Sequence, residues 1–177
     1  MNDRKFFIKI SVAAVIDISI VLIFAVLLSL LFSGCGNKNN KIDVSEMSDK
    51  SYSSNGELIV PKGYIAFEVY GKDKELILDS VLIKYKDNLS VADISKGACK
   101  YKNIPISFSG IGTMVYVQGI NNLFEFDNGP ESGWLYCVNG EFQGTSSGSL
   151  IAKDGDCVQW FYTLDLGKDI GADKVTK

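Results

Sequence analysis

The pattern of apolar and polar positions divides the chain into four parts. Residues 1–34 contain a long, mostly apolar run, whereas residues 35–60 are small and polar with few large apolar side chains. In residues 61–172, short apolar runs alternate with turn-forming residues, and residues 173–177 form a short tail. This pattern predicts a signal or anchor segment, a flexible tether and one folded domain.

The segment 1–34 has the features of a secretory signal. Basic residues stand within its first nine positions, an apolar core follows, and two small residues precede Cys35. That order is typical of a signal peptide and its cleavage site. It also resembles the lipobox of bacterial lipoproteins, in which the cysteine becomes the mature N-terminus and carries a diacylglycerol thioether. Phe32 departs from the Leu, Val or Ile that the lipobox usually has three places before the cysteine.

An uncleaved transmembrane anchor is the alternative interpretation. The run Ile10–Phe32 is long enough to span a bilayer, but Asp17 would then cost roughly 2.5–3.5 kcal/mol inside the membrane. Both interpretations keep the basic end of the segment in the cytoplasm. They therefore place the domain at the cell membrane, on its extracytoplasmic face, with membrane lipid bound through Cys35 in the first case.

The first half of the domain has the pattern of a hairpin followed by a helix. Ile65–Tyr70 alternates with period two, and Leu76–Tyr85 is a second strand-like run after a polar turn. Ser90 and Asp93 have the spacing of a short capping box. We therefore expect a short helix that begins after Ser90 and ends by Asn103.

The second half of the domain predicts further short strands. These strands are Ile104–Phe108, Thr113–Gln118, Trp134–Val138 and a last one with Val158, Trp160 and Tyr162 on one face. Pro105 indicates an edge strand, Asn139-Gly140 is a strong hairpin signal, and Asp154–Asp156 forms a tight turn. Short strands around one helix predict an α+β fold with a small β-grasp-like mixed sheet.

The composition excludes several classes of function. The chain has no histidine, no arginine after Arg4 and a net charge of −3 without a basic stripe. Nucleic-acid binding needs clustered Lys and Arg, and Ser-His-Asp or Cys-His catalysis needs histidine. Carboxylate-only chemistry stays formally open. We expect a binding protein and not an enzyme, with no catalytic residue, metal site or resident cofactor.

Three cysteines remain after Cys35, which is an odd number and gives no complete disulfide framework. Cys137 and Cys157 each lie in a strand-like run and could pair if those strands are neighbours. The alternative, which we favour, is that Cys99, Cys137 and Cys157 are buried free thiols.

Aromatic residues are the main candidates for ligand contact. Those on the strand faces could form a platform for a flat macrocycle, a sugar or a peptide, but they more often fill a core. The loops Phe124–Asp127 and Gly144–Gly148 are better contact candidates, because loops on a rigid scaffold carry function. The candidate ligand-binding residues are Phe124, Phe126, Trp134, Tyr136, Asn139, Phe142, Trp160 and Tyr162.

Five short motifs follow one another in the last third of the chain. They are Gly133-Trp134-Leu135-Tyr136, Val138-Asn139-Gly140-Glu141, Lys153-Asp154-Gly155-Asp156, Trp160-Phe161-Tyr162-Thr163 and Leu166–Gly171. Together they resemble the DUF4430 family, also described as a transcobalamin-like C-terminal domain. The resemblance covers roughly Tyr64 to Ala172 and implies the β-grasp-like fold of the smaller domain of vitamin-B12 carriers.

The resemblance also implies a function. Bacterial members are typically secreted, lipid-anchored or wall-attached, and some accompany vitamin uptake systems. A lipid-anchored binding protein that captures cobalamin or another small ligand for a membrane transporter is therefore one hypothesis. In the animal carriers a second, helical domain completes the cobalamin site, so one face alone would bury little of the ligand. The alternative is a cell-surface protein- or glycan-interaction (adhesion) module without a small ligand.

Overall fold

The computed structural model describes residues 42, 47–49, 51–52 and 58–172. The predicted signal or anchor, Cys35 and the tail 173–177 lie outside these residues, so the predictions made on them remain predictions. Within the described part of the chain, no helix is long and apolar enough to cross a membrane.

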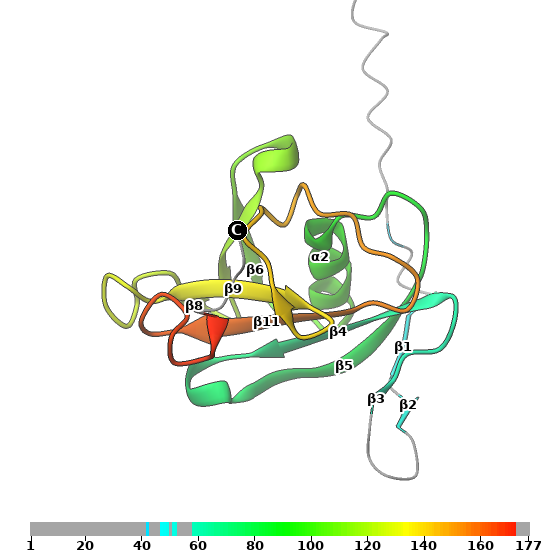
Figure 1. Cartoon of the computed structure of the whole chain (residues 1–177), viewed down its shortest axis with the longest axis horizontal. Helices are drawn as coiled ribbons and strands as arrows, with labels where there is room; N and C mark the ends of the chain where they lie inside the picture. Colours follow the sequence, from blue (N-terminus) through cyan, green and yellow to red (C-terminus); the bar gives the residue numbers. More distant parts are fainter. Residues whose placement is uncertain (1–41, 43–46, 50, 53–57, 173–177) are drawn as a thin grey trace, which may run out of the picture. The chain divides into compact units, whose positions relative to one another are not determined.

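Short strands and one α-helix make up the described elements (Figure 1). In chain order they are β1 (Met47–Asp49), β2 (Ser51–Tyr52), β3 (Leu58–Ile59), β4 (Tyr64–Tyr70), η2 (Lys72–Lys74), β5 (Leu76–Lys84), α2 (Val91–Tyr101), β6 (Ile106–Ser109), η3 (Gly112–Met114), β7 (Tyr116–Ile120), β8 (Leu123–Phe124), β9 (Gly133–Val138), β10 (Glu141–Phe142) and β11 (Cys157–Thr163). The predicted α+β class is confirmed in this mostly β arrangement.

The largest sheet has six strands in the order β1-β5-β4-β11-β9-β10. The predicted hairpin is present as the antiparallel pair β4 and β5. Strand β11 lies between β4, to which it is parallel, and β9, to which it is antiparallel, so the sheet is mixed. A second sheet has the order β6-β7-β8, and its edge strand β6 follows Pro105 as predicted. Strands β2 and β3 form a separate pair.

Helix α2 begins and ends where the sequence predicts. The Ser90 Oγ accepts a hydrogen bond from the Asp93 N–H (3.1 Å), and the Asp93 carboxylate accepts one from the Ser90 N–H (3.0 Å). This reciprocal capping box satisfies two backbone donors at the helix start. After Tyr101 the chain leaves the helix through Asn103, which has a positive φ of 55°.

The structure on both sides of β7 differs from the prediction. Strand β7 begins at Tyr116 and not at Thr113, because Gly112–Met114 form a 3-10 turn. Residues Asn121 and Asn122 both adopt a positive φ, which asparagine tolerates better than most residues. They make a tight turn that pairs β8 with β7, where the sequence pattern predicts only a loop.

Three short strands fall within residues 35–60, to which the polar composition assigned a tether. Strand β1 pairs with the edge of β5, and Met47 is buried. Gly97 of α2 makes room for this contact, since a Cβ at that position would lie 3.1 Å from the Met47 side chain and 3.0 Å from Ile42. Pairing with β5 and the contacts of Met47 and Ile42 with the helix thus hold β1 in place.

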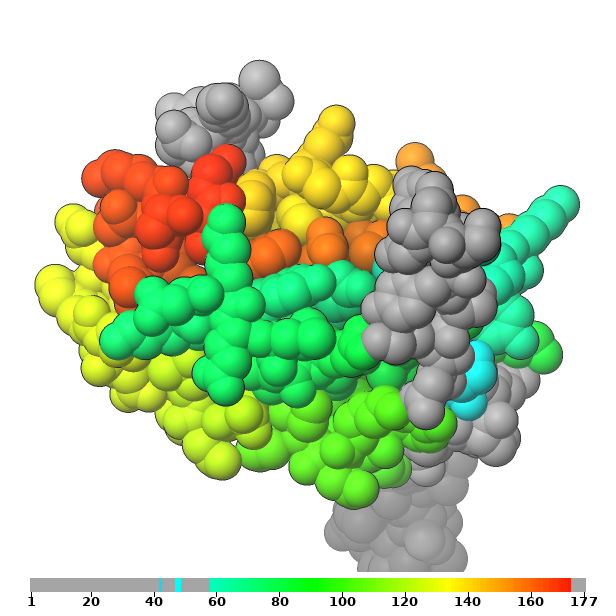
Figure 2. All heavy atoms as spheres, turned by 90° about the horizontal axis from the view of Figure 1, so that it is seen from below, coloured from blue at the N-terminus to red at the C-terminus, as the bar shows by residue number. Residues whose placement is uncertain are grey.

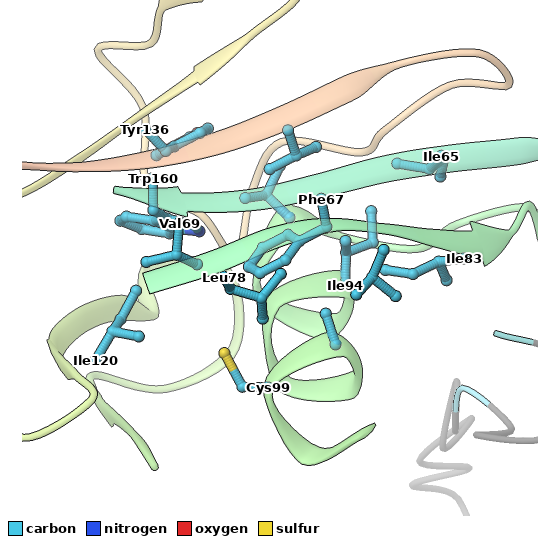
Figure 3. Close-up of a cluster of buried hydrophobic side chains, with 14 of the residues drawn as sticks. Ile65, Phe67, Val69, Leu78, Ile83, Ile94, Cys99, Ile120, Tyr136 and Trp160 are labelled. Carbon is cyan, nitrogen blue, oxygen red and sulfur yellow. The ribbon is translucent and has the colours of Figure 1, made fainter. Parts of the chain in front are cut away.

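The core lies between one face of the six-stranded sheet and helix α2. Figure 3 shows Phe67, Val69 and Leu78 of the sheet directed toward the helix that carries Ile94 and Cys99. Four aromatic residues on the inner face of β9 and β11 are also buried: Trp134, Tyr136, Trp160 and Tyr162. The structure therefore supports the core interpretation of these rings over an exposed platform.

A buried hydrogen-bond relay joins the sheet to the helix. The Trp160 indole N–H donates to the Ser95 Oγ (2.8 Å), and the Ser95 hydroxyl donates to the Val91 carbonyl (2.7 Å). Ser95 is fully buried, so the indole N–H has no access to water if this partner is removed.

We expect the substitution Ser95→Ala to lower the free energy of unfolding by about 1–3 kcal/mol, because it leaves the Trp160 N–H unsatisfied in the core. Urea unfolding of the wild type and the variant measures the difference. Lys100→Ala, on the exposed face of the same helix, is the control and should change stability by less than about 0.5 kcal/mol. An equal loss in both variants would contradict the relay.

Candidate functional site

One irregular segment, Gln143–Ala152, holds the helix and the two sheets together and is called the strap below. Figure 1 shows it in yellow to orange, passing between the N-terminal end of α2 and the connection from β6 to β7. On the helix side, the Val91 N–H donates to the Leu150 carbonyl (3.0 Å) and the Ala92 N–H to the Ser147 carbonyl (2.9 Å). The strap therefore satisfies two further donors at the helix start.

The other side of the strap is bound to the β6–β7 connection. The Gly148 N–H and the Ser147 hydroxyl both donate to the Val115 carbonyl, at 3.1 and 3.0 Å. The Ser146 hydroxyl donates to the Thr113 carbonyl. A Cβ on Gly148 would lie 2.6 Å from a backbone oxygen of Gly112, so only glycine allows this close approach.

The strap and the neighbouring strands enclose a pocket of about 280 Å³, called the aromatic pocket below. Its lining comes from β7, β9, β11 and the strap, and consists of Tyr116, Val117, Trp134, Leu135, Tyr136, Gln143, Gly144, Thr145, Ser146, Ser147 and Trp160. Three of the candidate ligand-binding residues, together with most of the predicted contact loop Gly144–Gly148, are thus brought to one place.

The rings of this pocket are held in fixed positions. The Tyr136 hydroxyl donates to the Thr145 carbonyl of the strap (3.0 Å), and burial raises the pKa of Tyr136 above its usual value. The Tyr136 and Trp160 rings lie with centroids 5.1 Å apart. The Gln143 amide, which donates to the Glu141 carbonyl (2.8 Å), adds a polar group to the lining. Such a site suits a flat or apolar group that also forms a few hydrogen bonds.

The other candidate residues lie away from the aromatic pocket. Tyr162 is fully buried, and its hydroxyl donates to the Phe124 carbonyl (2.9 Å). This bond helps to fix the loop that follows β8, where Phe126 is 63% exposed with a positive φ of 69°. Figure 2 shows this yellow-green loop beside the red C-terminal residues at one end of the molecule; the Leu166 N–H donates to the Glu131 carbonyl there.

Asn139 and Phe142 have local structural contacts. The Asn139 side chain donates to the Asp156 carboxylate (2.9 Å) and accepts from the Cys157 N–H (2.8 Å), so it joins two turns. Phe142 packs on Phe161, with ring centroids 5.7 Å apart. Phe142 pairs with Cys137 and Phe161 with Leu135, which puts this contact on the sheet face opposite Tyr136 and Trp160.

Two pocket residues, Tyr116 and Gln143, were missed as candidates in the sequence. Tyr116 lay in a predicted strand, where a half-exposed tyrosine is ordinary, and Gln143 directly follows a predicted hairpin. Neither position carries a local signal, because the fold alone brings them to Trp134 and Tyr136.

Much of the chain that lines the pocket is uncharged, although the Glu125 carboxylate accepts a hydrogen bond from the Tyr116 hydroxyl at its edge (3.4 Å). Residues 104–124 contain no Asp, Glu, Lys or Arg, and neither do residues 142–152. Among these residues Ile111 is 79% and Met114 70% exposed, on the β6–β7 connection that projects from the domain in Figure 1. Large apolar side chains that are exposed together on an uncharged connection make it a candidate interaction site.

The described cysteines are free thiols, as favoured from the sequence; Cys99 and Cys137 are buried as expected, whereas Cys157 is only partly buried. Strands β9 and β11 are neighbours, but Cys137 lies opposite Gln159 and not opposite Cys157. Burial raises the pKa of the Cys137 thiol to about 11, and burial with the nearby Glu68 carboxylate raises that of Cys157 to about 12. No group of three or more metal-ligating side chains occurs among the described residues.

Residues 88–163 match the family model described as Domain of unknown function (DUF4430). This match confirms the resemblance predicted from the motifs. No curated protein matches the chain.

Two solved structures are similar in backbone arrangement. A candidate metal binding protein from Ruminococcus gnavus ATCC 29149 is 13% identical, with a TM-score of 0.42 over 58% of this chain and 97% of that one. Haptocorrin in complex with Cbi is 15% identical, with a TM-score of 0.45 over 66% of this chain and 29% of that one. The chain thus spans less than a third of haptocorrin, and likenesses at this level say nothing about a ligand.

We expect alkylation of Cys137 and Cys157 in the folded protein to rise about tenfold per pH unit from pH 7 to pH 10 without levelling off, because the thiolate is the reactive form. Peptide mass spectrometry after iodoacetamide pulses measures each site. The urea-unfolded chain is the control, where the rate should level off above the ordinary thiol pKa of about 8.5. A plateau below pH 9 in the folded protein would contradict the raised pKa values.

Proposed function

We propose that this chain, which carries a DUF4430 domain over residues 88–163, is a lipid-anchored extracytoplasmic protein that binds part of a small organic ligand in its aromatic pocket. The supporting observation is the convergence of Tyr116, Tyr136 and Gln143 on one pocket. Aromatic rings with a few placed polar groups are the usual lining of ligand sites.

The size of the pocket limits what it binds alone. Its volume of about 280 Å³ lies just below the roughly 300–1,000 Å³ of small-molecule sites. The pocket therefore suits one ring or one substituent of a larger ligand. The DUF4430 resemblance supports cobalamin as the first ligand to test, and a membrane transporter or surface protein would then cover the part that the pocket leaves exposed. The predicted lipid at Cys35 would hold the domain beside such a transporter.

We expect saturable binding of cobalamin or cobinamide to the full chain in detergent, measured by calorimetry. Tyr116→Ala and Gln143→Ala should each weaken it about fivefold to tenfold, which corresponds to about 1–1.4 kcal/mol, since each removes a contact from the pocket. Phe126→Ala, which shortens an exposed ring outside the pocket, is the matched control and should leave the affinity unchanged. Binding that is lost in the control but not in the pocket variants would place the ligand on the loop after β8.

A second candidate function has its own supporting observation. The exposed Ile111 and Met114 lie on the projecting β6–β7 connection, which itself contains no charged residue. A protein partner with an apolar patch would bury both side chains. In that case the domain is a surface interaction module, and a small ligand is not required.

We expect the double substitution Ile111→Ser and Met114→Ser to reduce chemical crosslinking to a membrane or surface protein on intact cells by more than fivefold, because burial of the two side chains supplies the contact energy. Mass spectrometry of the crosslinked products gives the yield. Leu166→Ser removes a comparably exposed apolar side chain away from this surface and serves as the control. The same yield in all three proteins would rule out this interface.

A further inference from the structure

A second cavity of about 390 Å³ shares no lining residue with the aromatic pocket. It lies between the first turns of α2, the β6–β7 connection and the far end of the strap. Its polar lining is Asn88, Ser90, Asp93 and Lys96, and its apolar lining includes Phe108, Val115 and Ile151. The proposed function does not involve this cavity.

The cavity combines a carboxylate and an ammonium group that do not pair with each other. Asp93 and Lys96 are three positions apart on α2, so they are neighbours on one helix face. The Asp93 Oδ2 accepts hydrogen bonds from the Ser90 N–H (3.0 Å) and hydroxyl (2.6 Å). Among the described residues, nothing donates to the other oxygen of Asp93, and Lys96 forms no ion pair.

The backbone of the helix start is not available to a ligand. The N–H groups of Val91, Ala92 and Asp93 already donate to the Leu150 carbonyl, the Ser147 carbonyl and the Ser90 hydroxyl. A ligand carboxylate in this cavity therefore has the exposed Lys96 ammonium as its charged partner. A ligand ammonium has the remaining oxygen of Asp93.

The wall opposite these charges is apolar. Phe108 of β6, Val115 of the β6–β7 connection and the exposed Ile151 line it, and neither β6 nor the connection contains a charged residue. An apolar group in contact with these side chains would be removed from water, which is favourable by about 25 cal/mol per Å² of buried apolar area.

From this arrangement we infer that the cavity binds a zwitterionic amino acid with an apolar side chain. The ligand carboxylate pairs with Lys96, its ammonium pairs with Asp93, and its side chain packs against Phe108 and Val115. The inference does not depend on the proposed function, because the two pockets are lined by different residues.

The test is a calorimetric titration of the full chain in detergent with L-leucine, N-acetyl-L-leucine and L-leucinamide. Leucine should bind in a saturable manner, and each blocked form should bind about tenfold or more weakly, because each lacks one hydrogen bond to a charged group. Failure of leucine to saturate at millimolar concentration, or equal binding of all three compounds, would overturn the inference.

Two variants test which charged group of the ligand each residue binds. Lys96→Gln should make leucine and leucinamide bind equally, because the carboxylate has lost its partner, and Asp93→Asn should do the same for leucine and N-acetyl-leucine. Lys100→Gln, on the same helix outside the cavity, is the matched control and should retain the wild-type preference. Far-UV circular dichroism verifies that Asp93→Asn keeps the helix.

The outcome is separable from that of the proposed function. Tyr116→Ala and Gln143→Ala should leave leucine binding unchanged, since neither residue lines this cavity. An unchanged leucine preference in Lys96→Gln would overturn the inference even if leucine binds.

Discussion

The hydrogen bonds of the strap are the constraint on which both pockets depend. A helix start needs partners for its first N–H groups, and here the capping box supplies some while the Leu150 and Ser147 carbonyls supply others. The same few residues bind the Val115 carbonyl on the other side. A segment without regular structure is thereby fixed at both edges. The walls of the aromatic pocket and of the second cavity are consequently as well defined as the helix itself.

The four inward-facing aromatic residues of β9 and β11 combine two roles, since each buries a ring and keeps one polar atom for a specific partner. The Trp134 indole N–H donates to the Leu123 carbonyl (2.9 Å), and the Trp160 indole N–H donates to Ser95. Tyr136 reaches the strap at Thr145. The core therefore positions the surrounding loops through directed hydrogen bonds, and the same rings that stabilise the sheet contribute the inner wall of the aromatic pocket.

The features that the sequence predicts correctly are those set by patterns of adjacent residues. Alternation over Ile65–Tyr70, the Ser90 capping box and the Asn139-Gly140 turn each involve a few adjacent residues, and the structure confirms all three. The strap carries no such signal, because its hydrogen bonds join residues that are dozens of positions apart. Tyr116 meets the other pocket residues only after β7 and β9 have been placed. The sequence therefore predicted some of the aromatic residues that line the pocket. The position of the pocket could be found only from the folded structure.

The order of the strands has a consequence for folding during synthesis. Strand β11, at residues 157–163, is the last described strand of the sheet, yet it lies between β4 and β9. A chain that has emerged only as far as β10 can form the β4–β5 hairpin and the helix, but the sheet lacks its central strand. Contacts between residues so distant in sequence form slowly. The six-stranded sheet of this protein can therefore be completed only after residues 157–163 have been synthesised, and until then the facing edges of β4 and β9 have no partner strand between them.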